Sequence, residues 1–271
     1  MGMRRSFAFF SLAALSVACR RTEVLGSQNT TPPAGASPPI ESASVSTPQR
    51  VRHDGVGVAL ASDDWSMRET EPLIVPDTER RPVTLLLHAI CSDPTWTCDW
   101  LQYSELAPQW QLCPRAPTSC GGGGYKWTAS VTDTRRLLEL SLATLKARHA
   151  ARVRDDTVVL VGLSQGAYAV AAVVHDLATS SAAPSPLKVK GIVLHGAQTH
   201  LAATDVHRLG ARVALAAGDL DGAAPSMRAQ ALELRRQGVE ARFVSLGPVG
   251  HFIPVSSGMA IAELIDWTRQ E

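Results

Sequence analysis

Short apolar runs alternate with longer polar and mixed segments from about residue 80 to the end of the chain. The runs at 83–87, 157–161, 191–194, 212–217 and 241–246 are largely apolar. Runs of this length and character are typical of strands that are buried on both faces of a parallel sheet. Helix-like segments separate these runs, so the pattern predicts buried strands that alternate with helices.

Four segments between or after these runs carry the signals of helices. Ser130, followed by Asp133, resembles a capping box and opens a segment with leucines at helical spacing. Another segment follows Pro225 and stops at Gly238, as helices commonly do. The predicted helices lie after Ser130, at 167–174, at 227–237 and at 259–269.

One pentapeptide, Gly162-Leu163-Ser164-Gln165-Gly166, joins the predicted strand 157–161 to the predicted helix 167–174. A G-x-S-x-G between a strand and a helix is the nucleophile elbow of serine hydrolases. The turn is so tight that the positions two residues either side of the serine must lack bulk, and Gly162 and Gly166 meet that need. The motif predicts Ser164 as a nucleophile.

A nucleophilic serine needs a base and a group that orients the base. Asp221 follows the strand-like run 212–217, and His251 follows the next such run. The carboxyl ends of parallel strands share one edge, so both side chains are expected near Ser164. Asp219 is the alternative acid, and His195 precedes the acid in the chain and is expected to be structural.

An oxyanion hole requires two N–H donors aimed at the developing negative charge. The backbone N–H of Gln165, directly after Ser164, is the first candidate. Ile90 N–H, in the segment after the strand 83–87, is the second, with Cys91 N–H as its alternative. Ala89 stands where a glycine is usual in such loops.

The elbow, the Gly218-x-x-Asp221…Pro225 segment and Gly250-His251 together resemble the α/β-hydrolase superfamily. Within it they are similar to the phospholipase/carboxylesterase group that includes acyl-protein thioesterases. The resemblance covers roughly residues 80–270. It implies an α/β-hydrolase fold whose central sheet has about eight mostly parallel strands with helices on both faces. It also implies hydrolysis of esters or thioesters without a cofactor.

A lid in this superfamily is usually inserted after the strand that follows the elbow helix. Only about sixteen residues separate Leu194 from Arg212 here, which is too few for an inserted domain. We therefore predict no separate lid domain and an open site.

Four cysteines, Cys91, Cys98, Cys113 and Cys120, fall within thirty residues of one another. In an exported protein they predict two disulfides, and their spacing favours Cys91–Cys98 with Cys113–Cys120, although three connectivities are open. Neither pair has the C-x(2–4)-C spacing of a zinc site, so no metal is expected.

Two tryptophans near these cysteines, Trp96 and Trp127, are candidates for lining an acyl pocket. The alternative is that they anchor the core or the loops, which is the commoner use of such residues.

The first residues resemble an export signal. Arg4 and Arg5 precede a short apolar run that ends in Ser16-Val17-Ala18-Cys19. We expect a signal peptide at 1–19 with a candidate lipobox whose Cys19 is acylated, attaching the protein to a membrane. Residues 20–50, rich in Ser, Thr, Pro and Ala, are expected to be a disordered tether, and 51–271 the catalytic domain. The expected location is the bacterial cell envelope, lipid-anchored or periplasmic, or outside the cell.

Composition agrees with one domain that carries one core. The chain has 271 residues, 45% of them hydrophobic, and a net charge of +1 with no basic stripe, which argues against nucleic-acid binding. The favoured interpretation is a serine hydrolase that cleaves small-molecule carboxylic esters through Ser164, His251 and Asp221. A thioesterase or peptidase with the same triad is an alternative, as is a non-catalytic, surface-tethered binding protein on a hydrolase scaffold. The sequence does not indicate an oligomeric state.

Overall fold

The computed structural model of the protein describes residues 65–69, 80–94, 96–97, 109–181, 185–252 and 258–270. The predicted signal peptide 1–19 with Cys19 and the predicted tether 20–50 lie outside these residues.

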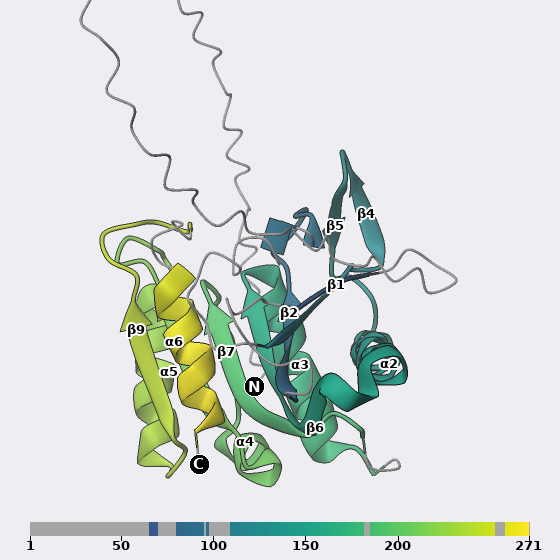
Figure 1. Ribbon diagram of the computed structural model, residues 1–271. Coiled ribbons are helices and arrows are strands. Elements are labelled where there is room, and N and C mark those ends of the chain that lie inside the picture. Colours follow the sequence, from purple (N-terminus) through teal and green to yellow (C-terminus); the bar gives the residue numbers. More distant parts are fainter. Residues whose placement is uncertain are drawn as a thin grey trace, which may run out of the picture. The chain divides into compact units, whose positions relative to one another are not determined.

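The main sheet of the described residues has seven strands rather than about eight (Figure 1). β1 pairs antiparallel with β3, and every other neighbouring pair is parallel. The predicted mostly parallel sheet is therefore confirmed. In sheet order the strands are β1 Trp65–Glu69, β3 Trp110–Pro114, β2 Arg81–Leu87, β6 Val153–Leu163, β7 Val189–His195, β8 Arg212–Ala217 and β9 Ala241–Ser245.

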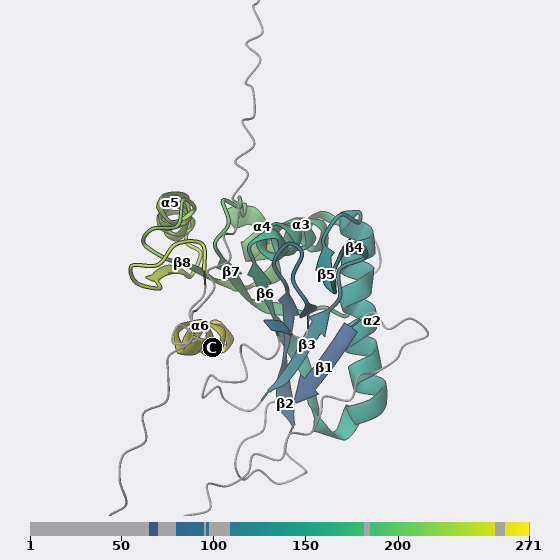
Figure 2. The same ribbon diagram turned by 90° about the horizontal axis from the view of Figure 1, so that it is seen from above.

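Helices cover both faces of this sheet, as Figure 2 shows from above. The buried side chains of α2, α3, α4 and α5 pack with one face of the strands, and those of α6 pack with the other. Two-sided burial explains why the strand sequences are apolar at consecutive positions instead of alternating. The helices are α2 Val131–His149, α3 Gln165–Thr179, α4 Ala203–Leu209, α5 Ala224–Arg236 and α6 Gly258–Arg269, with a 3₁₀ turn at Ala150–Arg152.

The N-terminus of α2 shows the predicted cap. The Ser130 hydroxyl accepts a hydrogen bond from the Asp133 backbone N–H at 3.1 Å. This bond satisfies one of the N–H groups that the first turn of a helix leaves unpaired, which fixes where α2 begins.

A small hairpin stands apart from the main sheet. Its strands, β4 Thr118–Gly121 and β5 Gly124–Lys126, pair antiparallel. Ser92, in the segment after β2, forms an isolated bridge with Tyr125 of this hairpin. The hairpin is thereby attached to the loop in which one oxyanion donor is expected.

The segment between β7 and β8 contains only the short helix α4, so no lid domain is inserted there. None of the helices in the described part of the chain has both the length and the hydropathy needed to cross a membrane.

Candidate active site

Ser164 lies in the turn between β6 and α3, with φ 53° and ψ −114°. A non-glycine residue in this left-handed region is strained, which is typical of a nucleophile held at an elbow. A Cβ atom at Gly162 would lie 2.5 Å from the Cα of Ala167, and one at Gly166 would collide with the carbonyl oxygen of Leu87. Both positions therefore require glycine, and the turn projects the serine above the sheet edge.

The structure brings the three predicted triad side chains together from the ends of β6, β8 and β9. The Nε2 atom of His251 lies 2.9 Å from the Ser164 hydroxyl, and its Nδ1 atom lies 2.9 Å from Oδ2 of Asp221. A carboxylate only accepts hydrogen bonds, so Nδ1–H donates to Asp221. That leaves Nε2 as the acceptor for the serine proton.

Asp221 is built to stay ionised beside His251. Its side chain is only 4% exposed, and its Oδ1 accepts a hydrogen bond from the Ala223 N–H at 2.9 Å. Burial pushes the pKa of Asp221 upward, but the hydrogen bonds from Ala223 and His251 outweigh it and the pKa is lowered. The rival acid, Asp219, is 47% exposed and accepts a hydrogen bond from the Ser245 hydroxyl, so it braces the loop against β9.

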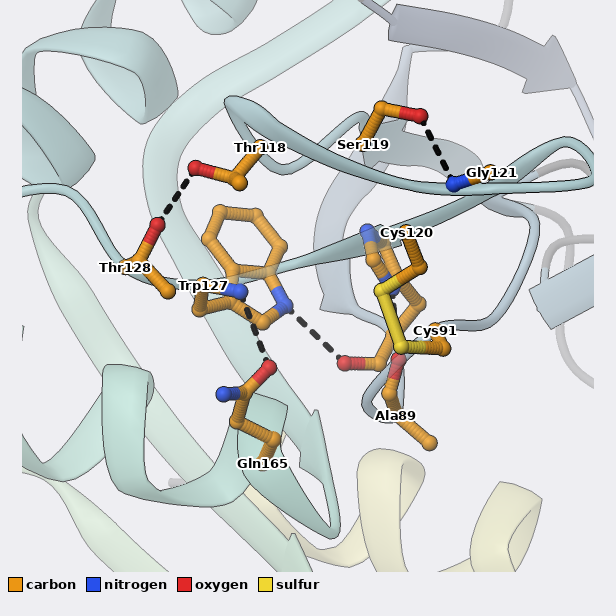
Figure 3. The surroundings of a disulfide bond; sticks show 10 residues. Ala89, Cys91, Thr118, Ser119, Cys120, Gly121, Trp127, Thr128 and Gln165 are labelled. Atoms are coloured by element: carbon orange, nitrogen blue, oxygen red, sulfur yellow. Dashed lines mark hydrogen bonds between the residues drawn. A yellow bond between two sulfur atoms is a disulfide. The ribbon is translucent and has the colours of Figure 1, made fainter.

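The two expected oxyanion donors lie at the start of α3 and in the loop after β2. Within the described residues, the backbone N–H groups of Gln165 and Ile90 donate to no other group. The Gln165 N–H also lies at the positive end of the α3 dipole, which favours negative charge. The side chain of Gln165 points toward Trp127, and its Oε1 atom accepts a hydrogen bond from the backbone N–H of Trp127 at 2.9 Å (Figure 3).

His88 holds the loop after β2 through three hydrogen bonds that the sequence patterns did not reveal. Its Nε2 accepts from the Ala116 N–H at 3.1 Å, so Nδ1–H donates to the Ala89 carbonyl at 2.8 Å. Its own carbonyl accepts from the indole N–H of Trp127 at 2.9 Å. Burial lowers the pKa of His88, which keeps the ring neutral and its tautomer fixed. The sequence signal was the place of His88 directly after a buried strand, where oxyanion loops usually have a histidine followed by glycine.

The disulfide nearest the site joins Cys91 to Cys120, with 5.5 Å between the Cα atoms (Figure 3). The predicted pairs Cys91–Cys98 and Cys113–Cys120 are therefore wrong. Tertiary packing decides the pairing, because the β4–β5 hairpin folds back over the loop after β2 and brings Cys120 beside Cys91. Cys113 is also disulfide-bonded, and Cys98 lies outside the described residues.

Cys91 occupies an unusual backbone conformation next to Ile90, the predicted second oxyanion donor. Its φ of 52° lies in the left-handed region, which disfavours residues with a side chain. The bridge to Cys120 and the hydrogen bond from the Tyr125 N–H to the Ser92 carbonyl hold the chain there. The loop that carries Ile90 is thus tied on both sides.

The two candidate pocket tryptophans have different surroundings. Trp127 is buried in the main hydrophobic core, where its two hydrogen bonds tie the loop of His88 to the helix of Gln165. Trp96 is half-exposed. Trp127 therefore acts as an anchor between the two segments in which the oxyanion donors are predicted, whereas a contact of either ring with an acyl group stays a prediction.

His195, at the end of β7, lies directly behind the triad. Its carbonyl accepts the Ser164 N–H at 2.9 Å, and its ring centroid is 6.2 Å from that of His251. Burial lowers the pKa of His195 to about 4, assisted by the charge of His251 and opposed by Asp221. The ring is therefore neutral at pH 7 and puts no second positive charge beside the base.

No group of three or more His, Cys, Asp or Glu side chains that could hold a metal ion occurs among the described residues. The polar groups that converge on this edge of the sheet are the triad and the backbone N–H donors. A set of this kind is chemically suited to acyl transfer, with a nucleophile, a base and donors for an oxyanion.

Comparison of the sequence with protein-family models and with curated proteins finds no match. Solved structures do resemble it. Esterase PE8 is similar with a TM-score of 0.52 and 21% identity, over 73% of this chain and 99% of that one. Acyl-protein thioesterase 2 of Zea mays is similar with a TM-score of 0.52 and 18% identity, over 74% of this chain and 98% of that one. Propionate-bound esterase Est2 of the planctomycete Thermogutta terrifontis has a TM-score of 0.51 and 14% identity, over 75% of this chain and 87% of that one. These likenesses confirm the expected fold.

Proposed function

We propose that this chain, which has the α/β-hydrolase fold, is a serine hydrolase that cleaves carboxylic esters through an acyl-enzyme intermediate. One observation carries the proposal. A continuous chain of hydrogen bonds runs from the Ser164 hydroxyl through His251 to Asp221, with 2.9 Å at each step. A strained serine at an elbow, a base within reach of its proton and a buried carboxylate behind the base together make a nucleophile.

The reaction proceeds in two halves. Ser164 attacks the ester carbonyl carbon while Nε2 of His251 removes the hydroxyl proton, and the N–H groups of Gln165 and Ile90 stabilise the oxyanion. The tetrahedral intermediate collapses, and the leaving alkoxide takes the proton from His251. Water then attacks the acyl-enzyme while Nε2 of His251 takes one of its protons. When this second tetrahedral intermediate collapses, His251 returns the proton to the Ser164 oxygen, and the acid leaves. Asp221 keeps the imidazole in the correct tautomer and stabilises its cation throughout.

Two observations support esters as the substrates. The solved structures that resemble the chain include proteins described as esterases. The side chain of His251 is 53% exposed, which suits substrates that reach the site directly from solvent. A thioesterase is the second candidate, supported by the likeness to the acyl-protein thioesterase of Zea mays. A purely binding role is disfavoured because a scaffold without catalysis has no need for the aligned hydrogen bonds of His251.

We also propose that the protein is exported and that Cys19 carries a lipid. The Cys91–Cys120 disulfide supports export, because disulfides persist in oxidising compartments. The leader pattern before Cys19 supports lipidation. Metabolic labelling with a palmitate analogue tests the lipidation. Label that persists in Cys19→Ala would overturn the assignment of the lipid to Cys19.

Hydrolysis of p-nitrophenyl esters tests the catalytic proposal. Ser164→Ala should lower kcat by roughly 10⁴–10⁶, as for other triads. Thr179→Ala is a matched control, because it removes a hydroxyl from the other end of the same helix, where it bonds only the His175 carbonyl. If Ser164→Ala kept the activity of the wild-type protein, the proposal would be refuted. If the wild-type protein hydrolysed thioesters but not esters, the second candidate, a thioesterase, would be favoured.

A further inference from the structure

Gly196 immediately follows β7 and lies against the hydrogen bond between His251 and Asp221. Its backbone has φ +60°, and its N–H donates to the Ala216 carbonyl at 3.0 Å. The preceding carbonyl, that of His195, holds the backbone of Ser164. The two-residue segment 195–196 therefore contacts all three members of the proposed triad.

The space beside Gly196 is filled by the reacting groups themselves. A Cβ atom there would lie 2.9 Å from Cε1 of His251, and 3.1 Å from both His251 Nδ1 and Asp221 Oδ2. The last two atoms share the hydrogen bond that orients the base. A contact under 3.0 Å between carbon atoms is repulsive, so one partner must move.

Neither partner has freedom to move without damage to the site. The imidazole of His251 is held at Nε2 by Ser164 and at Nδ1 by Asp221. The carboxylate of Asp221 is held at Oδ1 by the Ala223 N–H. The backbone of Gly196 is fixed by its own bond to the Ala216 carbonyl. A side chain at 196 would therefore displace the imidazole, lengthening one or both of its hydrogen bonds.

We propose that Gly196 is a positioning residue, whose missing side chain creates the space in which His251 and Asp221 align. This inference rests on the proposed function, because it gives Gly196 a part in holding the base. The competing explanation is that glycine is needed only for the positive φ. The chain offers a control that separates the two explanations.

Gly210, the C-cap of α4, has nearly the same positive φ, +63°, and a Cβ atom there would have nothing within 4 Å. Gly210→Ala therefore imposes similar backbone strain without touching the proposed site. Any larger effect of Gly196→Ala comes from its contact with the base and the acid.

The kinetic test compares both variants of the full chain with wild type on a p-nitrophenyl ester. Gly196→Ala should lower kcat by about 100-fold with little change in KM, since a 1 Å misplacement of a catalytic group costs that much. Gly210→Ala should match wild type in both kcat and KM.

A stability cycle tests the same contact without relying on activity. Thermal unfolding is measured for Gly196→Ala, His251→Ala and the double variant. If the Cβ atom collides with the imidazole, Gly196→Ala lowers Tm less in the His251→Ala background than in wild type. Equal losses of Tm in both backgrounds would overturn the inference, as would equal kinetics of Gly196→Ala and Gly210→Ala in an active protein. An inactive wild type with non-additive Tm values would refute the proposed function and leave the contact established.

Discussion

Removal of the Cys91–Cys120 disulfide should weaken the fold and the proposed oxyanion hole together. The bridge closes a loop with a sequence separation of 29 residues. In the chain-entropy model a loop of this length contributes about 3.5 kcal/mol at 25 °C, because it restricts the unfolded chain. The double variant Cys91→Ser/Cys120→Ser should lose about that much free energy of unfolding.

The effect on catalysis follows from the conformation of Cys91. Its φ of 52° costs about 1–2 kcal/mol for a residue with a side chain, and the bridge helps to hold it there. Without the bridge the loop can relax and carry the neighbouring Ile90 N–H away from the oxyanion. Complete loss of one donor lowers kcat by about 10²–10³, so partial loss should lower it by about 10- to 100-fold.

Urea unfolding followed by tryptophan fluorescence measures the first effect, and p-nitrophenyl ester kinetics measure the second. Cys91→Gly/Cys120→Ser is the matched control, because glycine adopts the same φ without strain and equally lacks the bridge. Its free energy of unfolding should fall by a similar amount to that of the double-serine variant, but its kcat should remain higher. A serine pair with wild-type stability, an unchanged m-value and wild-type kcat would refute the reasoning.

Two further predictions concern groups around the base. The pKa of His195, about 4 in the fold, is lower than the value near 6.5 expected on unfolding, so the unfolded chain binds its proton first. The free energy of unfolding should therefore fall by about 3 kcal/mol between pH 6.5 and pH 4. In urea unfolding measured across this pH range, His195→Phe should flatten the dependence of stability on pH. A variant that keeps the wild-type slope of stability against pH would count against the prediction. Asp221→Asn should lower kcat about 10⁴-fold in ester kinetics, whereas Asp219→Asn should stay within a few-fold of wild type. The reverse order would make Asp219 the acid.

The nucleophile elbow and the shared edge at which the parallel strands end could be predicted from the sequence, because each follows from a local pattern of residues. Gly162 and Gly166 flank Ser164 in the one turn that requires them, between a buried strand and a helix. Parallel strands end at one edge, so residues that directly follow them, such as Asp221 and His251, are brought near one another whatever their separation.

The disulfide pairing and the supports of the site could not be predicted, because they depend on where loops pack. Spacing alone favoured Cys113 as the partner of Cys120, but the β4–β5 hairpin crosses to the loop of Cys91. The hydrogen bonds of His88 and the close approach of Gly196 to His251 are also contacts between distant segments. A single glycine after a strand carries no sequence signal for such a role.

The central claim is that Ser164 is a nucleophile activated by His251. Reaction with a fluorophosphonate probe, followed by peptide mass spectrometry, tests it most directly. The account predicts a single covalent adduct on the peptide that contains Ser164, formed much more slowly in His251→Ala and absent in Ser164→Ala. An adduct on another residue, or labelling of Ser164 at an unchanged rate without the imidazole, would contradict it.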